Sequence, residues 1–322
     1  MKERRYMILS MNPGYDQWHV VYNPPAIDGV FRADKVFRFV SGKGLNVARV
    51  LKNLGFNGYI CLNIIGGGTG EIISQNSRKE GICCREFRIA EESRINTCIM
   101  TEYSHESVSY NEPGPKLSRD EVKKFKEYLS VQLKKERDCD VVISGTPCRG
   151  ITEDDFREIF ALITAAGNEL IVDVSGRWLQ IAAEFPLRLL KVNREEFKEA
   201  FYLDAFIFDH NLKRFKNQRR IQDLVVTDGK NGCMVLNGND RCFYSRVRGV
   251  AGGSYPVGSG DSFLAGYLFR CAQGAGINEC VRYASACGLA NTYEYGPGVF
   301  DRFAVEAQLN HVNINEKGGS VL

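Results

Sequence analysis

Residues 140–145, Asp-Val-Val-Ile-Ser-Gly, form a short apolar run that ends in two small residues. The run lies between two segments with helix-start signals: Ser118 forms a capping-box pattern with Glu121, and Thr152 begins a segment that ends near Gly167. Further apolar runs follow at residues 170–174, 189–192 and 224–227. Helices that alternate with short, nearly continuous apolar strands are typical of a mostly parallel sheet covered on both faces. We therefore predict an α/β fold with three layers, in which helices cover both sides of a mostly parallel central sheet.

Small and polar residues follow several of these predicted strands. In a parallel sheet, right-handed crossovers bring the carboxyl ends of the strands to one edge, where ligands usually bind. The residues expected to converge on a crevice at that edge are Ser144, Gly145, Asp173, Asn193 and residues 227–229.

Two other segments, residues 12–40 and 82–111, are strand-like and lack helical periodicity. They are candidates for a separate small sheet over the crevice. We therefore predict one domain, residues 1–322, with a β lid formed by insertions at about 13–40 and 85–112.

The composition is that of an ordinary globular protein of 322 residues, with 44% hydrophobic residues. A formal net charge of +3 is too small to indicate a nucleic-acid or membrane partner, and no apolar run reaches the ~20 residues needed to span a bilayer. The eleven cysteines are spread along the chain without C-x-x-C spacing or a signal peptide, so we expect free thiols in a reducing cytoplasm. The four histidines lie far apart, and we expect no structural metal.

Residues 255–266, Tyr-Pro-Val-Gly-Ser-Gly-Asp-Ser-Phe-Leu-Ala-Gly, indicate a reaction centre. Gly258 and Gly260 allow a tight turn with bare N–H groups, and Asp261 follows where an apolar run begins a helix. Phosphoryl transfer requires groups that hold the phosphate oxygens and orient the acceptor hydroxyl, and this turn supplies both. Taken alone, a Gly-x-Gly-Asp segment before a helix more often supplies only a helix cap, and the other motifs of the chain reverse this interpretation of Asp261.

Other segments carry motifs that make the catalytic interpretation stronger. They are residues 12–16 (Asn-Pro-Gly-Tyr-Asp), 41–48 (Ser-Gly-Lys-Gly-Leu-Asn-Val-Ala), 94–96 (Arg-Ile-Asn), 111–115 (Asn-Glu-Pro-Gly-Pro), 191–196 (Lys-Val-Asn-Arg-Glu-Glu), 227–232 (Thr-Asp-Gly-Lys-Asn-Gly) and 258–261 (Gly-Ser-Gly-Asp). The chain has no P-loop, no complete G-x-G-x-x-G after a strand and no protein-kinase motif. Together the segments resemble the ribokinase-like (PfkB) sugar kinases, in the branch of 1-phosphofructokinase and tagatose-6-phosphate kinase. The resemblance covers nearly the whole chain and implies a ribokinase-like fold.

The resemblance implies a set of residues for the sugar phosphate. Asp16 and Asn46 would hold ring hydroxyls, and Lys43 and Arg94 would bind the phosphate already present. A second Asn-Pro segment ends at Asp28, but Asp16 has the spacing to Lys43 that is similar to the family's. The remaining sugar-side positions implied by the motifs are Gly42, Ser144 and Gly145, although residues 146–149 depart from the family pattern.

On the nucleotide side, the resemblance implies ATP as donor and Mg²⁺ as cofactor. Glu196 would act on Mg²⁺ indirectly, because this hard ion keeps several waters and binds few protein oxygens. The positions implied for the nucleotide are Lys191, Asn193, Glu196, Thr227, Gly229, Gly232, Ser259 and Gly260. Catalysis would rest on Asp261 as the base, with Gly258 and Gly260 at the transferring phosphoryl group.

We therefore expect an ATP-dependent kinase that phosphorylates the free primary hydroxyl of fructose 1-phosphate or tagatose 6-phosphate. The alternatives are a kinase of an unphosphorylated sugar or nucleoside, and a catalytically silent sugar-phosphate sensor. The resemblance also implies a homodimer that forms through the β lid.

Overall fold

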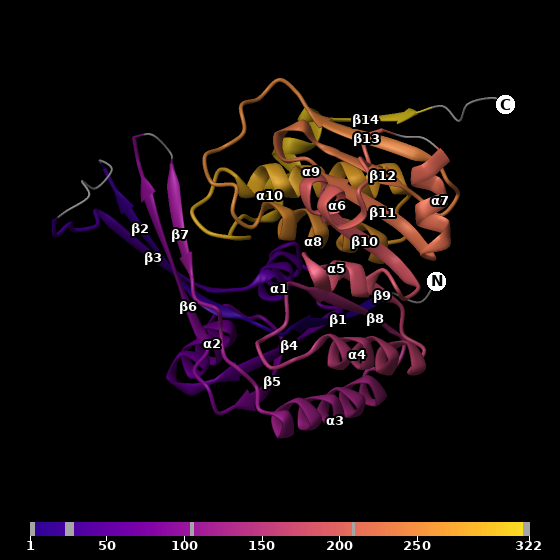
Figure 1. The fold of residues 1–322 in the computed structure, drawn as a ribbon. Helices are drawn as coiled ribbons and strands as arrows, with labels where there is room; N and C mark the ends of the chain where they lie inside the picture. Colours follow the sequence, from indigo (N-terminus) through magenta and orange to yellow (C-terminus); the bar gives the residue numbers. More distant parts are fainter. Residues whose placement is uncertain (1–3, 23–28, 104–105, 208–209, 318–322) are drawn as a thin grey trace.

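The computed structural model describes residues 4–22, 29–103, 106–207 and 210–317. The alternative sugar-binding residue Asp28 lies outside these residues. In the described chain, the strands form two separate sheets, and the smaller one stands to one side of the larger one (Figure 1). No described helix combines the length and the apolar character needed to cross a membrane.

The larger sheet contains ten strands in the described residues. They are β1 (Arg5–Ser10), β4 (Tyr59–Gly66), β5 (Cys84–Ile89), β8 (Cys139–Ser144), β9 (Leu170–Asp173), β10 (Leu187–Asn193), β11 (Ile221–Thr227), β12 (Cys233–Leu236), β13 (Cys242–Val247) and β14 (Val312–Lys317). Their order is β14-β13-β12-β11-β10-β9-β8-β1-β4-β5. The strands from β11 to β5 are parallel to their neighbours, whereas β12, β13 and β14 form an antiparallel edge. The predicted mostly parallel sheet is therefore confirmed.

Helices cover both faces of this sheet (Figure 1). One face packs against α3 (Arg119–Lys135), α4 (Glu153–Ala165), α5 (Arg177–Ala182), α6 (Arg194–Phe201) and α7 (His210–Gln218). The other face packs against α1 (Lys43–Asn53), α2 (Gly67–Lys79), α8 (Ser259–Ala272), α9 (Ile277–Asn291) and α10 (Arg302–Gln308). Two 3₁₀ turns are η1 (Gly229–Asn231) and η2 (Leu309–His311). Because successive side chains of a strand point to opposite faces, Met7 and Leu9 of β1 enter the first core while Tyr6 and Ile8 enter the second.

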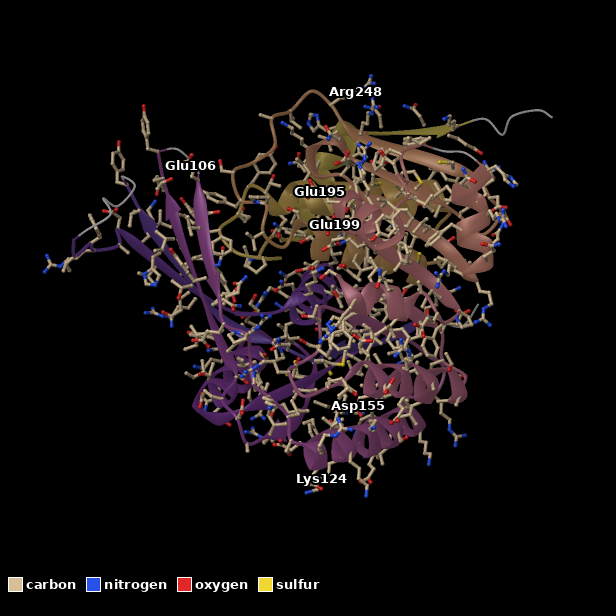
Figure 2. The ribbon with its side chains drawn as sticks, viewed as in Figure 1. Glu106, Lys124, Asp155, Glu195, Glu199 and Arg248 are labelled. Carbon is tan, nitrogen blue, oxygen red and sulfur yellow. The ribbon has the colours of Figure 1, made fainter. Side chains whose placement is uncertain are left out.

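The helix caps expected from sequence are present. Ser118 caps α3 in a capping box with Glu121, and Thr152 caps α4 in the same way with Asp155. Asp155 also accepts hydrogen bonds from Arg119 and Lys126 of α3, and Figure 2 places it between the two helices. Asp155 thus caps α4 and also links α4 to α3.

The small sheet consists of β3 (Lys35–Ser41), β2 (Gly14–Val21), β6 (Arg94–Thr101) and β7 (Ser107–Asn111), in that order. The predicted start of the second lid segment, at about residue 85, is wrong, because β5 pairs in parallel with β4 and belongs to the larger sheet. In the structure this part of the small sheet begins with β6 at Arg94. On one face of the small sheet, Trp18 and Cys98 pack with Phe37 and with Tyr255 and Tyr295 from the main body. This contact places the small sheet beside the loop that leads into α8.

Candidate functional site

Two glycines at the start of α8 lie in close contacts. Gly258 has φ 86°, and a Cβ there would lie 2.5 Å from Pro297 Cβ. A Cβ on Gly260 would lie 2.8 Å from the ammonium of Lys191. The chain therefore brings the amino end of a 14-residue helix next to the ammonium of Lys191.

Asp261 follows this turn and is 6% exposed. Its Oδ2 accepts a hydrogen bond from Asn46 Nδ2 at 2.7 Å. Burial raises the pKa of the Asp261 carboxyl to about 6, although the Lys43 ammonium acts in the opposite direction. A carboxylate with a pKa in this range can accept a proton near neutral pH.

Arg49 sets the orientation of the Asn46 amide. Its Nη1 donates to Asn46 Oδ1 at 3.3 Å, which leaves the Asn46 amide nitrogen to face Asp261. Arg49 is 3% exposed and also donates to the backbone oxygens of Val40 and Pro297. The guanidinium thus joins α1, the end of β3 and the turn beside Gly258.

Asp173 at the end of β9 links two lysines. Its carboxylate accepts from Lys43 Nζ and from Lys191 Nζ, each at 2.9 Å, and it has no exposed surface. Burial alone would raise the pKa of Asp173, but the Lys191 and Lys43 ammonium groups outweigh it and lower the pKa. In turn, Asp173, Asp261 and Glu196 raise the pKa of Lys43 against the effect of burial. One buried carboxylate therefore holds both lysine side chains beside the start of α8.

The inner face of the small sheet supplies a second group of polar residues. Asp16 is 7% exposed, and its Oδ1 accepts from Asn96 Nδ2 at 2.7 Å. Burial raises the pKa of Asp16 and lowers that of Arg94. Arg94 Nε and Asn96 Oδ1 are buried and have no hydrogen-bond partner among the described residues. Because a buried polar atom without a partner is costly, these atoms indicate a place for a polar ligand.

Both groups line one cavity of about 810 Å³. Fourteen of the residues chosen from sequence lie in its wall: Asp16, Gly42, Lys43, Asn46, Arg94, Lys191, Asn193, Glu196, Thr227, Gly229, Gly258, Ser259, Gly260 and Asp261. Ser144 and Gly145 are not among its lining residues. Ser144 is buried, and its Oγ has no hydrogen-bond partner in the part of the chain that the structure describes. Gly145 lies against the Lys43 side chain, because an ideal Cβ on Gly145 would be 3.4 Å from Lys43 Cβ.

A second cavity of about 330 Å³ adjoins the first. The two share Thr227, Gly229, Lys230, Pro256, Ser259 and Gly260, and Gly232 lines only the second. Its other walls are mostly apolar or small, including Val247, Val250, Phe263 and Leu289. A flat, largely apolar ring would fit there, with a polar chain leading to Asp261.

Asn193 and Glu196 form the capping box of α6: Asn193 Oδ1 accepts from Glu196 N at 2.8 Å, and Glu196 Oε2 accepts from Asn193 N at 3.2 Å. The motif therefore has a structural role, and both side chains also line the large cavity. No group of three or more His, Cys, Asp or Glu side chains suited to a metal occurs in the described parts of the chain. One carboxylate and one amide do suit Mg²⁺ that is bound mainly by phosphate and water.

Four contributors were given no role from sequence: Arg49, Asn96, Asp173 and Asn291, although Asp173 was expected at the crevice and Asn96 lies in the 94–96 motif. Asn96 could have been found, since it lies two residues after Arg94 on one strand and shares its face. Asn291 of α9 donates to Val257 O at 2.9 Å and accepts from Gly298 N at 2.7 Å, which ties the loop before α8 to a later turn. Its partners lie in separate loops, and the sequence contains no signal for that contact.

One cavity brings together the amino end of α8, the side chains of Lys43 and Lys191, and the Asp261 carboxyl with its raised pKa. The same cavity is lined by the polar side chains of the small sheet and is large enough for a sugar. This is the arrangement of a small-molecule kinase. Residues 10–300 match the pfkB family of carbohydrate kinases, and the chain belongs to that family. It is therefore a sugar kinase that transfers a phosphoryl group to an alcohol.

Individual relatives agree with this assignment. A 1-phosphofructokinase of Borreliella burgdorferi is 26% identical over 287 residues, which cover 88% of this chain and 90% of the relative. Escherichia coli phosphofructokinase-2, solved with substrates and products, has a TM-score of 0.85 at 24% identity and covers 95% of this chain and 98% of its own. A possible 1-phosphofructokinase of Thermotoga maritima has a TM-score of 0.85 at 22% identity, over 98% of this chain and all of its own. The predicted family and the fold class are confirmed.

Proposed function

We propose that this chain transfers the γ-phosphoryl group of ATP to the free primary hydroxyl of a ketohexose monophosphate, fructose 1-phosphate or tagatose 6-phosphate. The observation that carries the proposal is Arg94: this half-buried side chain lines the same cavity as Asp261, and its buried Nε has no hydrogen-bond partner among the described residues. A phosphate on the sugar would supply the missing partner with charge-assisted hydrogen bonds. The 26%-identical 1-phosphofructokinase is consistent with such a substrate.

The two cations have different surroundings. Lys43 interacts with Asp173, Asp261 and Glu196, whereas the charged neighbour of Arg94 is Asp16. We therefore assign Lys43 to the transferring phosphoryl group and Arg94 to the phosphate that the sugar already carries. This assignment refines the expectation that both residues bind one phosphate.

The reaction would use the chain's own groups as follows. Asp261 accepts the proton of the attacking hydroxyl, while the N–H groups of Gly258 and Gly260 and the amino groups of Lys43 and Lys191 stabilise charge on the transferring group. Asp16 and Asn46 hold sugar hydroxyls. Glu196 and Asn193 would hold Mg²⁺ through water, and the ion would supply charge neutralisation at the nucleotide phosphates. The apolar second cavity would take the adenine.

The outer face of the small sheet supports the proposal of a dimer through this sheet. Across it, β-pairing aligns Val36, His19, Ile99 and Val108 in one row. Val36 is 40% exposed and Val108 is 55% exposed, so apolar surface remains uncovered. Oligomers also occur among the structural relatives, since E. coli phosphofructokinase-2 has been solved as a tetramer.

Steady-state kinetics with pairs of sugars test the function. We expect kcat/KM to be far higher for fructose 1-phosphate or tagatose 6-phosphate than for the free sugar. Arg94→Ala should lower kcat/KM by about 10- to 150-fold for the phosphorylated sugar only, because the loss of one charge-assisted interaction costs about 1.5–3 kcal/mol. Fructose 6-phosphate and nucleosides belong in the panel. A wild-type preference for a free sugar or nucleoside would replace this proposal with that kinase, and an absence of ADP release with every acceptor would favour a sensor.

A further inference from the structure

The carboxylate of Glu92 occupies the amino end of α2. It accepts hydrogen bonds from Gly68 N at 3.1 Å and from Thr69 N. A Cβ on Gly67 would lie 2.0 Å from Glu92 Oε2, so this glycine makes room for the carboxylate. A glycine-rich turn at a helix start usually favours an outside anion, but here a side chain of the same chain satisfies it.

The next residue, Ser93, is hydrogen-bonded to the same turn before α2. Ser93 is 2% exposed, its N–H donates to Gly66 O at 2.9 Å, and its Oγ accepts from Gly66 N at 2.9 Å. Residues 92 and 93 therefore attach the start of β6 to the turn between β4 and α2.

A second carboxylate holds the chain on the other side of Arg94. Glu112 Oε2 accepts from Ile95 N at 2.8 Å. Arg94 thus lies between two anchored positions, and its side chain passes close to Gly14, where an ideal Cβ would be 3.1 Å from Arg94 Cγ. Arg94 lines the large cavity, and the backbone on both sides of it is held by hydrogen bonds.

We infer that Glu92 is a positioning residue for Arg94 and thereby for the selection of a phosphorylated sugar. The inference depends on the proposed function, because it assigns to Arg94 the phosphate of the substrate. A long side chain binds an anion well only when its backbone is fixed beforehand, since otherwise binding must also order the strand. The amino end of α2 provides that fixed point, and the negative charge of Glu92 suits the positive end of the helix dipole.

The test compares Glu92→Ala with Glu92→Gln. Glu92→Ala removes the acceptor for both N–H groups, and we expect KM for the sugar phosphate to rise by about 3- to 10-fold. The values of kcat, of KM for ATP and of kcat/KM for the free sugar should stay close to wild type. Glu92→Gln keeps one amide oxygen as acceptor and should lie between wild type and Glu92→Ala.

Glu71→Gln is the matched control, because Glu71 lies on the same helix in an exposed pair with Arg88 at 3.1 Å. It should leave all constants unchanged. Arg94→Ala, measured in parallel, separates the two claims. If Arg94→Ala removes the preference for the phosphorylated sugar while Glu92→Ala keeps wild-type KM, the positioning role is overturned and the function stands.

Two other outcomes are also decisive. If Arg94→Ala leaves the preference intact, the proposed function itself fails. If Glu92→Ala lowers kcat equally for phosphorylated and free sugars, Glu92 has only a general structural role, and the inference is overturned.

Discussion

Asp261 lies among groups that shift its pKa in opposite directions. Burial raises the pKa to about 6, and the nearby Lys43 ammonium lowers it. A base must be unprotonated to accept a proton, so activity is lost as the pH falls through this pKa. We expect kcat/KM to fall about tenfold per pH unit below about pH 6 and to be level above it, measured by coupled ADP release between pH 5 and 8.

Asp261→Asn is the companion variant. We expect kcat to fall by about 10²–10⁴-fold, the range for loss of a positioned base, with nucleotide binding retained. The native pKa is above the ordinary value of 3.8, so the wild type loses stability as the pH rises from about 4 to 6, and the amide does not. The stability of the variant relative to wild type should therefore increase over this range in urea titrations. Full activity of Asp261→Asn would exclude Asp261 as the base.

At the scale of single residues, local motifs predicted most of the cavity wall. Lys43, Asn46 and Asp261 lie in short signatures whose chemistry can be read from neighbours in sequence. Asp173 shows why the roles of other site residues could not be predicted. Its position after a strand was noted, but its two lysine partners lie 130 and 18 residues away, and only the fold brings them to 2.9 Å.

Among the secondary-structure elements, α6 begins with a motif that serves two purposes. Glu196 caps the helix and also lines the cavity. Glu196→Gln tests the second purpose, because a glutamine at this position can still form the capping box while the charge is lost. We expect the Mg²⁺ concentration for half-maximal rate to rise several-fold, with the sugar KM and the melting temperature nearly unchanged. An unchanged Mg²⁺ titration would leave Glu196 with the capping role alone.

Helices were predicted more accurately than strand membership. The capping boxes at Ser118 and Thr152 mark helix starts because the cap residues bond to backbone atoms three positions away. Strand β5 was assigned to the lid because residues 82–111 are strand-like and lack helical periodicity. Strand-like character also suits an edge strand of the larger sheet, where Phe87 packs on Phe125 of α3. It predicts a strand and does not identify the pairing partner.

For the whole molecule, the small sheet has one face on the cavity and one face open. If two copies associate through the open face, a charge in its apolar row should separate them. We expect the wild type to sediment as a dimer and Val108→Glu to sediment as a monomer. Val131→Glu is the control, because Val131 is 47% exposed on α3, in a different element, and should not change the mass. Equal masses for wild type and Val108→Glu would exclude this interface.

The position of β1 in the middle of the larger sheet affects how the chain folds during its synthesis. Its two neighbours are β4, whose pairing starts at Tyr59, and β8, whose pairing starts at Cys139. This apolar strand precedes both neighbours in the chain, so both of its edges are covered only after the segment through Ser144 has left the ribosome. Pairing between such distant segments is slow, and an uncovered apolar strand can pair with other chains. The nascent chain is therefore most prone to aggregation early in its synthesis, before α4 exists.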